Sequence, residues 1–362
     1  MASDAASREA GSPRHAVATA FAPGRVNLIG EHTDYNQGLA LPFAIAEGII
    51  VRAQAADSDS PNAGRIYARA RDLEEEDEFE LSDIHPAKGW RAFVRGVAAE
   101  LSRAGYSPPG ARLEIGGDLE QGAGLSSSAA LEVALCLALA DLGSSAPLDR
   151  IALARLCARV ENDWAGAQTG MLAQLAALDG APDTAVCIDF RTLQIEEVPL
   201  RLEGWRFVLV DSGERHANAS SGYNERRAEC ARACELMGID SLRDASAEAV
   251  ARLPAPLRLR AEHVLGENAR VGETVAALYA RDLATVGELL NASHESLRDL
   301  YAVSTPAVER AVEGLRRDGA AGARLMGGGF GGSVLGLFAP GVQAPSEARE
   351  VRPGAGAHLL SS

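Results

Sequence analysis

The feature that most constrains this fold is a loop of small residues that opens directly into an apolar helix. Residues 122–130 contain only glycine, alanine, leucine and serine, and the apolar spacing that follows predicts a helix from about Ser127 to Leu142. Small residues let the backbone approach a ligand, and the free N–H groups that begin a helix attract anions. A serine-rich helix cap after a flexible turn would have the same composition, so both interpretations stay open at this point.

A second segment concentrates hydrogen-bonding side chains in a short space. Residues 24–36 follow an apolar, strand-like run and place Arg, Glu, His, Asp and Tyr around two glycines. A site for a small polyhydroxylated ligand needs this variety, because each buried hydroxyl requires a donor or acceptor of its own. A solvated polar turn is the alternative interpretation.

A third segment is dense in glycine. Residues 327–332 include five glycines in six positions. So many glycines cost conformational entropy on folding, which favours a backbone that closely approaches a ligand or another loop. A tight hairpin turn is the alternative, although two glycines would suffice for one.

Elsewhere the apolar periodicity mixes strands and helices without strict βαβ alternation, which predicts an α+β fold. We expect the acidic run 74–80 to be a solvated loop or edge. The expected tail, two domains and elements are as follows: disordered tail 1–15; N-terminal domain 16–200; C-terminal domain 201–362; strands 16–21, 48–55, 111–115, 184–190 and 205–210, with a final strand 333–338; helices 90–103, 149–162, 223–236, 258–279, 283–293 and 306–317.

Composition excludes several classes of partner. The net charge of −15 disfavours nucleic acid, which needs a basic face. The longest apolar run, 129–142, carries two carboxylates and is too short to cross a bilayer, so we expect no membrane association. Lys88 is the only lysine, which rules out a phosphate loop of the Gly-Lys-Ser/Thr type. Five cysteines and no signal peptide predict core thiols in a cytoplasmic protein, and no protein partner is evident.

These three segments, in this order, resemble the three motifs of the GHMP small-molecule kinases, and within that superfamily the chain resembles the galactokinases. Further stretches also resemble galactokinase sequences: 210–213, 221–230, 293–304 and 322–324. The resemblance therefore covers about 20–338. It implies a two-domain GHMP kinase fold, with mixed β-sheets, packed helices and an active site in the cleft between the domains. It also implies ATP-dependent phosphorylation of D-galactose at C1, giving galactose 1-phosphate and ADP.

The resemblance also implies roles for individual residues. Arg25 would stabilise the charge of the transferred phosphoryl group, and Trp90 would lie near the adenine, with core packing as the alternative for Trp90. The remaining assignments are: sugar hydroxyls, Glu31, His32 and Asp34, with Tyr223 closing the pocket; ATP phosphates, Gly122, Ala123, Gly124, Leu125, Ser126, Ser127 and Ser128; Mg²⁺, Ser128 and Glu161.

One position departs from the family pattern. Galactokinases carry an aspartate in a Gly-x-x-Asp-Gln segment, twelve residues after the metal-binding glutamate, where it accepts or orients the proton of the C1 hydroxyl. Here Ala173 occupies that position. Losing a general base costs about 10² to 10⁴ in rate, so we expect an impaired chemical step.

Three interpretations of Ala173 compete. The chain is a galactokinase inactivated at this position, or a sensor that binds galactose and ATP without efficient turnover. Alternatively, it retains slow catalysis through Arg25 and Mg²⁺ alone. The identity of the sugar is a separate question. A close relative of galactose, such as N-acetylgalactosamine, is an alternative substrate, because pocket size cannot be predicted from one sequence.

Overall fold

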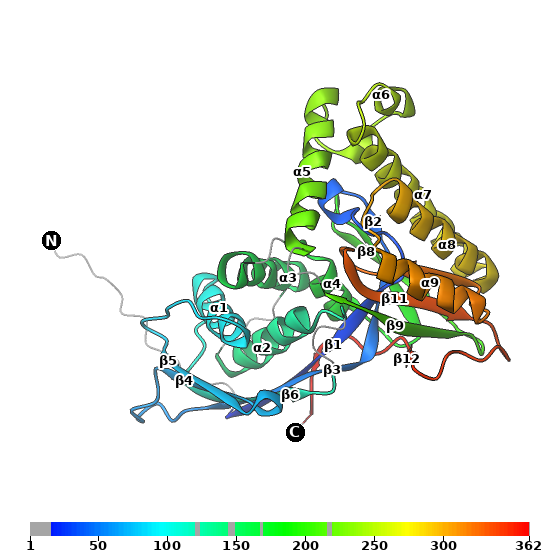
Figure 1. Cartoon of the computed structure of the whole chain (residues 1–362). Helices are drawn as coiled ribbons and strands as arrows, with labels where there is room; N and C mark the ends of the chain where they lie inside the picture. The colour runs from blue at the N-terminus through cyan, green and yellow to red at the C-terminus, as the bar shows by residue number, and fades with distance from the viewer. Residues whose placement is uncertain (1–15, 120–123, 144–148, 167–168, 216–218, 362) are drawn as a thin grey trace.

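The computed structural model describes residues 16–119, 124–143, 149–166, 169–215 and 219–361 (Figure 1). Its largest sheet has six strands in the order β13-β1-β3-β6-β4-β5, and neighbours are antiparallel except for the parallel pair β4 and β6. The strand bounds are β1 Val17–Asn27, β3 Pro42–Ala55, β4 Arg65–Ala70, β5 Glu75–Glu80, β6 Ala111–Gly117 and β13 His358–Leu359.

Four helices cover one face of this sheet (Figure 1). Two of them, α2 (Ser127–Gly143) and α4 (Leu172–Asp179), contact β1 and β3 directly. The other two, α1 (Trp90–Arg103) and α3 (Arg150–Arg159), pack against α2. Helix α2 therefore lies between the sheet and other helices, which explains why it is apolar on every side.

The other half of the molecule is built on a four-stranded sheet in the order β10-β11-β9-β12, against which α8 and α9 pack. A three-stranded sheet, β2-β7-β8, borders α7. The bounds are β9 Arg206–Arg215, β10 Gly322–Leu325, β11 Gly331–Phe338, β12 Arg349–Val351, β2 Leu39–Ala40, β7 Thr184–Asp189, β8 Gln194–Pro199, α5 Ala219–Met237, α6 Ala247–Ala251, α7 Leu257–Tyr279, α8 Leu283–Asp299 and α9 Pro306–Arg317.

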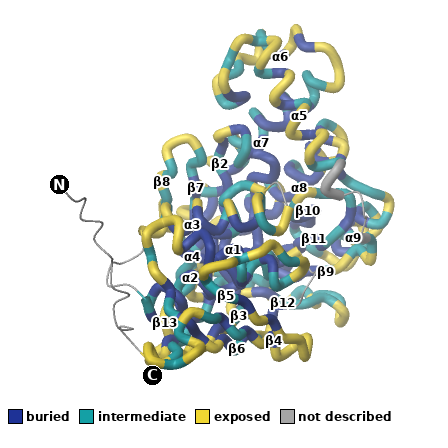
Figure 2. Tube along the Cα trace, turned by 90° about the vertical axis from the view of Figure 1, so that its left-hand side faces the viewer, coloured by how far each residue is buried: buried dark blue, intermediate teal, exposed yellow. Residues whose placement is uncertain are grey.

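Four short helical turns complete the described elements: Asp34–Asn36, Arg71–Leu73, Val160–Ala165 and Leu242–Asp244. Burial is greatest where the sheets meet their helices, and the end of the molecule around α6 is largely exposed (Figure 2). Among the described residues, no helix is both long and apolar enough to cross a membrane.

Most predicted elements are present, with corrections at the ends. Helices α1 and α9 have the predicted bounds, and the acidic run is β5, an edge strand. The strand 333–338 is not the last one, because β12 and β13 follow it. These two strands are three and two residues long, too short to show a periodic pattern, and they form by pairing with β9 and β1. The expected tail 1–15 lies outside the described residues.

Candidate active site

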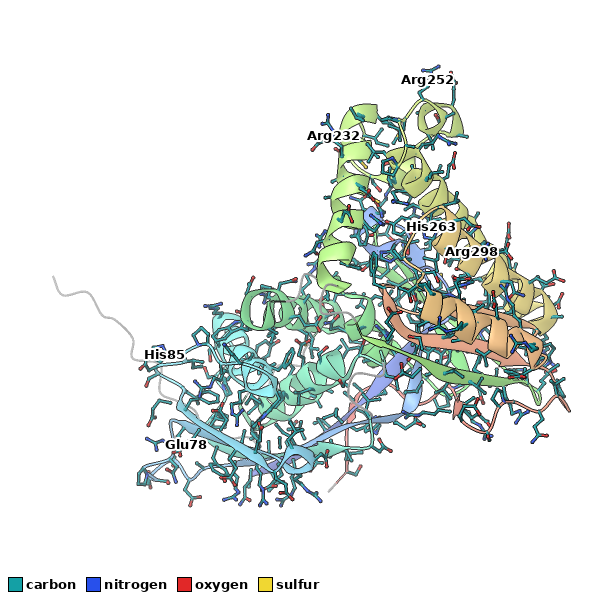
Figure 3. The ribbon with its side chains drawn as sticks, viewed as in Figure 1. Glu78, His85, Arg232, Arg252, His263 and Arg298 are labelled. Atoms are coloured by element: carbon teal, nitrogen blue, oxygen red, sulfur yellow. The ribbon has the colours of Figure 1, made fainter. Side chains whose placement is uncertain are left out.

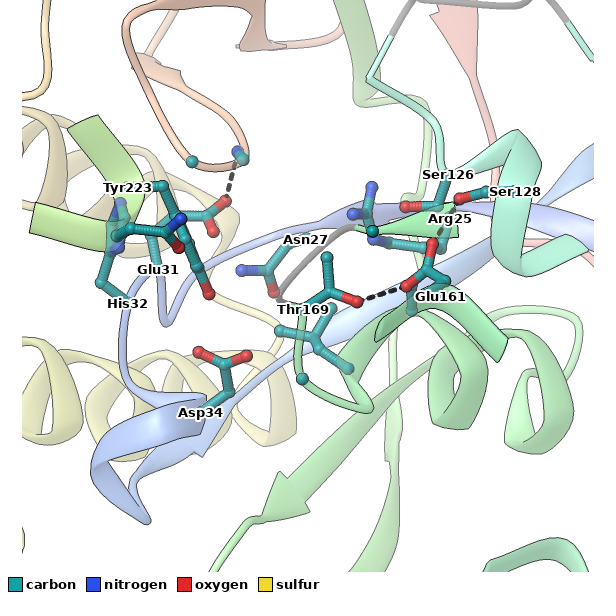
Figure 4. A pocket seen from close by; sticks show the side chains of 17 residues that line it. Arg25, Asn27, Glu31, His32, Asp34, Ser126, Ser128, Glu161, Thr169 and Tyr223 are labelled. Atoms are coloured by element: carbon teal, nitrogen blue, oxygen red, sulfur yellow. Dashed lines mark hydrogen bonds between the residues drawn. The ribbon is translucent and has the colours of Figure 1, made fainter. Parts of the chain in front are cut away.

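A cavity of about 450 Å³ lies where the predicted segments meet (Figure 4). A second hollow of about 420 Å³ adjoins it, and both are lined by Arg25, Ser126, Ser128, Gly327 and Gly328. The walls come from the end of β1 and the turn after it, the starts of α2 and α4, the turn Val160–Ala165, helix α5 and the glycine cluster before β11. The structure thus brings together segments that lie about 300 residues apart in the sequence.

One wall carries four polar side chains, which we call the clamp: Glu31, His32, Asp34 and Tyr223. In Figure 4 they lie on the same side of the cavity. The carboxylate of Glu31 is oriented by the other half of the molecule. Its Oε1 accepts a hydrogen bond from the Gly327 amide at 2.8 Å and lies 3.0 Å from Nη2 of the fully buried Arg324.

The backbone at His32 is strained. Its φ of 62° lies in the left-handed region, which residues other than glycine adopt at a cost in free energy. Asn36 stabilises this turn by donating to the His32 carbonyl at 2.8 Å, and Nδ1 of His32 lies 2.9 Å from the Tyr35 hydroxyl. Burial lowers the pKa of His32 to about 3, so the ring is neutral at physiological pH.

Asp34 faces the same cavity from the turn Asp34–Asn36. Burial raises the pKa of its carboxyl to about 6, so it is mostly ionised at neutral pH and becomes protonated in mild acid. Gly170 lies beside it. A Cβ atom at residue 170 would be 2.4 Å from Asp34 Oδ2, so a larger residue there would displace this carboxylate.

The opposite wall carries Arg25 at the end of β1 and the loop that begins α2 (Figure 4). Nη1 of Arg25 donates to the Gly124 carbonyl at 2.8 Å, and its amide donates to the Leu125 carbonyl at 3.0 Å. Burial lowers the pKa of Arg25, while the carboxylates of Glu31 and Glu161 raise it. An arginine remains a cation in any such setting, so the wall presents one fixed positive charge.

Glu161 anchors a buried polar network beneath this wall. Its Oε1 accepts from the Ser128 hydroxyl at 2.6 Å, and its Oε2 accepts from the Thr169 hydroxyl and from Nε2 of Gln174 at 3.1 Å. Gln174 also donates to Glu132 at 3.3 Å. Glu132 is wholly buried, and burial raises its pKa well above the ordinary value.

Ala173 lines the cavity in the first turn of α4, next to Leu172. The start of a helix favours a negative charge, so this position would stabilise a carboxylate. A methyl group instead leaves the position without a proton acceptor.

Of the predicted site residues, Gly122 and Ala123 lie outside the described residues. Leu125 and Ser127 line the second hollow, as Gly124 does. Trp90 packs against the core of the first half, and its indole Nε1 donates to Glu75 at 2.7 Å. The cysteines are free thiols, and the described residues include no group of three or more His, Cys, Asp or Glu side chains suited to a metal ion.

Sequence reasoning missed several residues that shape this site: Asn27, Glu132, Thr169, Gln174, Glu267 and Arg324. Asn27 is 1% exposed, lines the cavity, and its side-chain O and N have no hydrogen-bond partner among the described residues. Glu132 did give a signal, since it is a carboxylate inside an otherwise apolar helix. Glu267 and Arg324 act through contacts between segments that are distant in sequence, and no local sequence pattern predicts such contacts.

Family comparisons agree with this geometry. The chain matches the galactokinase galactose-binding signature over residues 8–55, the GHMP kinases N terminal domain over 92–181 and the GHMP kinases C terminal domain over 274–356. It is 40% identical to the galactokinase of Thermotoga petrophila over 321 residues, which are 88% of this chain and 89% of the relative. It is 42% identical to the galactokinase of Mycobacterium tuberculosis over 339 residues, 91% of each protein.

Solved structures extend the comparison. The crystal structure of Lactococcus lactis galactokinase complexed with galactose superposes with a TM-score of 0.86 at 32% identity, covering 95% of each chain. Mevalonate kinase from Methanococcus jannaschii has a TM-score of 0.64 at 18% identity, covering 94% of this chain and 98% of that one. At that identity, the second likeness concerns the fold alone.

Proposed function

The chain belongs to the galactokinase family of GHMP kinases, and we propose that its cavity binds D-galactose beside ATP for phosphoryl transfer to the C1 hydroxyl. The observation that carries this proposal is the convergence of the three sequence segments on one cavity. We place the domain boundary near residue 200, so that residues 16–200 and 201–362 both contribute to the cleft.

We assign the sugar to the clamp. Carboxylates accept hydrogen bonds from hydroxyls, and Glu31 and Asp34 supply two carboxylates that line the cavity. His32 is neutral, so it can donate to the sugar through one ring nitrogen while the other is paired with Tyr35. Tyr223 covers this end, where its ring packs 5.3 Å from that of His32. The Lactococcus lactis relative, whose structure contains galactose, supports this choice of ligand.

We assign the ATP phosphates to residues 122–128 and to the hollow beneath the glycine cluster. The backbone N–H groups at the start of α2 suit an anion, which agrees with a chain that has only one lysine. Arg25 lies at the junction of the two hollows, where the γ-phosphoryl group would meet the sugar. Phosphoryl transfer depends mainly on positioning and on neutralising charge, and Arg25 supplies charge at this point.

The residues present also fit a magnesium ion. Ser128 and Glu161 offer a hydroxyl and a carboxylate within 2.6 Å of each other, and Mg²⁺ prefers oxygen ligands. Mg²⁺ is commonly held by one or two protein groups together with substrate phosphates, so a larger cluster is not required. When bound there, the ion would neutralise charge on the transferred phosphate. Thr169 and Gln174 keep the Glu161 carboxylate in place for it.

We further propose that the chemical step is slow because of Ala173. The carboxylates of the clamp and of the Glu161 network are held by ion pairs and hydrogen bonds. At the start of α4, by contrast, Leu172 and Ala173 offer no side-chain acceptor for the C1 proton. Substrate binding would then be intact while proton removal is unassisted.

The test is a long incubation of the chain with ATP, Mg²⁺ and D-galactose, followed by ³¹P NMR of the products. We expect slow formation of galactose 1-phosphate and ADP, with N-acetylgalactosamine and glucose as comparison sugars. The proposal is wrong if galactose neither binds in calorimetry nor gives a sugar phosphate. A product from N-acetylgalactosamine alone would identify a different sugar specificity.

Ala173 also favours a second candidate, a galactose-responsive binding protein. It would bind galactose and nucleotide tightly and recruit a partner only when the ligands are present. A pull-down with and without galactose separates this role from an enzyme, provided that the captured protein is the same in repeated preparations and is released when galactose is removed.

A further inference from the structure

We propose that Glu267 is a positioning residue for sugar recognition, because its carboxylate fixes the turn that presents Glu31 and His32 to the cavity. This inference rests on the proposed function of the same site. Glu267 lies on α7, in the second half of the molecule, and does not line the cavity itself.

The carboxylate of Glu267 accepts hydrogen bonds from four donors. Its Oε1 accepts from the Gly30 amide at 3.0 Å, the Glu31 amide at 3.4 Å and the Ser293 hydroxyl at 2.7 Å. Its Oε2 accepts from Nε of Arg270 at 2.8 Å. The side chain is fully buried, so these four donors replace the water that an exposed carboxylate would have.

The residues around Glu267 stabilise the ionised form of its carboxyl. Burial alone would raise the pKa of this carboxyl, but His263, Arg270 and Arg324 together lower it to about 2. Glu267 is therefore an anion at neutral pH, where its carboxylate accepts hydrogen bonds through both oxygens.

The turn that Glu267 contacts has an unusual backbone, which requires glycine at residue 30 and is strained at His32. Gly30 has a φ of 96°, and a Cβ there would lie 2.6 Å from the Leu39 carbonyl oxygen and the Ala40 Cα. Two residues later His32 occupies the left-handed region. Backbone strain of this kind survives only where neighbouring contacts determine the conformation.

A second contact comes from the same helix. Nε2 of His263 lies 3.2 Å from the Glu31 carbonyl, one turn before Glu267 on α7. His263 is fully buried, whereas Arg232 and Arg252 project from the surface at the far end of the molecule (Figure 3). Helix α7 thus contacts both the N–H and the C=O group of Glu31. A change at Glu267 would therefore alter the clamp although Glu267 itself does not line the cavity.

The experiment compares Glu267→Gln with Glu262→Gln. Glutamine keeps the size of the side chain but removes its charge and turns an N–H₂ group toward backbone donors. Glu262 is a matched control on the same helix, near the surface and paired with Arg258 at 2.7 Å. Calorimetry measures the Kd of D-galactose and, separately, of a non-hydrolysable ATP analogue with Mg²⁺, first in the parent chain.

For Glu267→Gln we expect galactose to bind about tenfold or more weakly, with nucleotide affinity within about twofold of the parent. The control should match the parent for both ligands. Amide hydrogen exchange should be faster at residues 30 and 31 in the variant alone. A role confined to overall stability would weaken both ligands together or neither, and either result would overturn the inference.

Ser293→Ala is the milder variant, in case Glu267→Gln does not fold. It removes one of the four donors and leaves the carboxylate in place, so we expect galactose affinity to fall about threefold and nucleotide affinity to stay unchanged. An unchanged galactose Kd in a folded Ser293→Ala protein would contradict the proposal. If the parent chain itself binds no galactose, the proposed function fails rather than the role of Glu267.

Discussion

Two regions that line the cavity are built differently: the clamp, and the start of α4, which we call the second wall. The clamp is held by groups from the distant half of the molecule, where Arg324 and Gly327 fix the carboxylate of Glu31 and Glu267 fixes its backbone. The wall at the start of α4 meets the same cavity with the aliphatic side chains of Leu172 and Ala173. With the roles proposed above, binding and chemistry would depend on separate regions, so that one could fail while the other stays intact.

The largest effect should come from adding an acceptor to the second wall. Ala173→Asp should raise kcat by about 10² to 10⁴, because it supplies the missing base at a helix start that favours a carboxylate. ADP release with galactose measures this change. Galactose Kd should stay within about twofold, since the clamp is untouched.

Ala173→Asn is the matched control for that substitution. It has nearly the same shape but no basic carboxylate, so it should leave kcat close to that of the parent. An equal gain from Asn and Asp would mean that shape, and not proton acceptance, limits the reaction. An unchanged kcat in Ala173→Asp would show that the missing acceptor at residue 173 does not limit the chemical step.

The next effect concerns the metal side. In the Ala173→Asp background, Glu161→Gln should lower kcat by about 10² to 10³, because removing a charge that stabilises the transition state typically costs that much. Galactose Kd should not change. Asp163→Asn, an exposed carboxylate on the same turn, is the control. A fall in galactose affinity with unchanged kcat would mean that Glu161 acts in sugar binding and not in the chemical step.

A smaller effect is expected within the clamp. His32→Asn should weaken galactose binding about tenfold, because it removes a ring that packs on Tyr223 and one hydrogen-bonding nitrogen. Asparagine tolerates the left-handed backbone, so the turn should survive. The non-hydrolysable nucleotide should bind as in the parent. Equal losses for both ligands, by calorimetry, would mean that the walls are coupled.

The smallest effect is a pH dependence carried by Asp34. Its pKa is raised to about 6 by burial, so the folded state binds this proton more tightly than the unfolded chain does. The stabilising contribution of the protonated form is full in acid and is lost as the pH rises through about 6. The parent should therefore lose stability between the pKa of the unfolded chain and about pH 6, whereas Asp34→Asn should not. The melting temperature of Asp34→Asn minus that of the parent should rise over this pH range, by on the order of 2 °C. A difference that stays constant from acid to neutral pH would show that Asp34 titrates normally.

Local features were predictable, and long-range partners were not. The composition of segments 24–36, 122–128 and 327–332 marked each as a candidate ligand loop, and their resemblance to the three motifs of the GHMP kinases assigned them to one site. Helix α9 begins at a proline after a capping threonine, so its start can be predicted from the sequence alone. By contrast, Glu267 meets Gly30 across 237 positions, and no periodic pattern encodes that contact. The fold places it there because α7 packs beside β2 and the turn before it.

The most direct test of the contrast between the walls is a crystal structure of the chain with D-galactose and a non-hydrolysable nucleotide. The account predicts galactose on Glu31, His32 and Asp34, with its C1 hydroxyl toward Arg25 and the Ala173 methyl and no protein acceptor within hydrogen-bond distance of that hydroxyl. A C1 hydroxyl hydrogen-bonded to another carboxylate of this chain would contradict the account, because the second wall would then contain a base of its own.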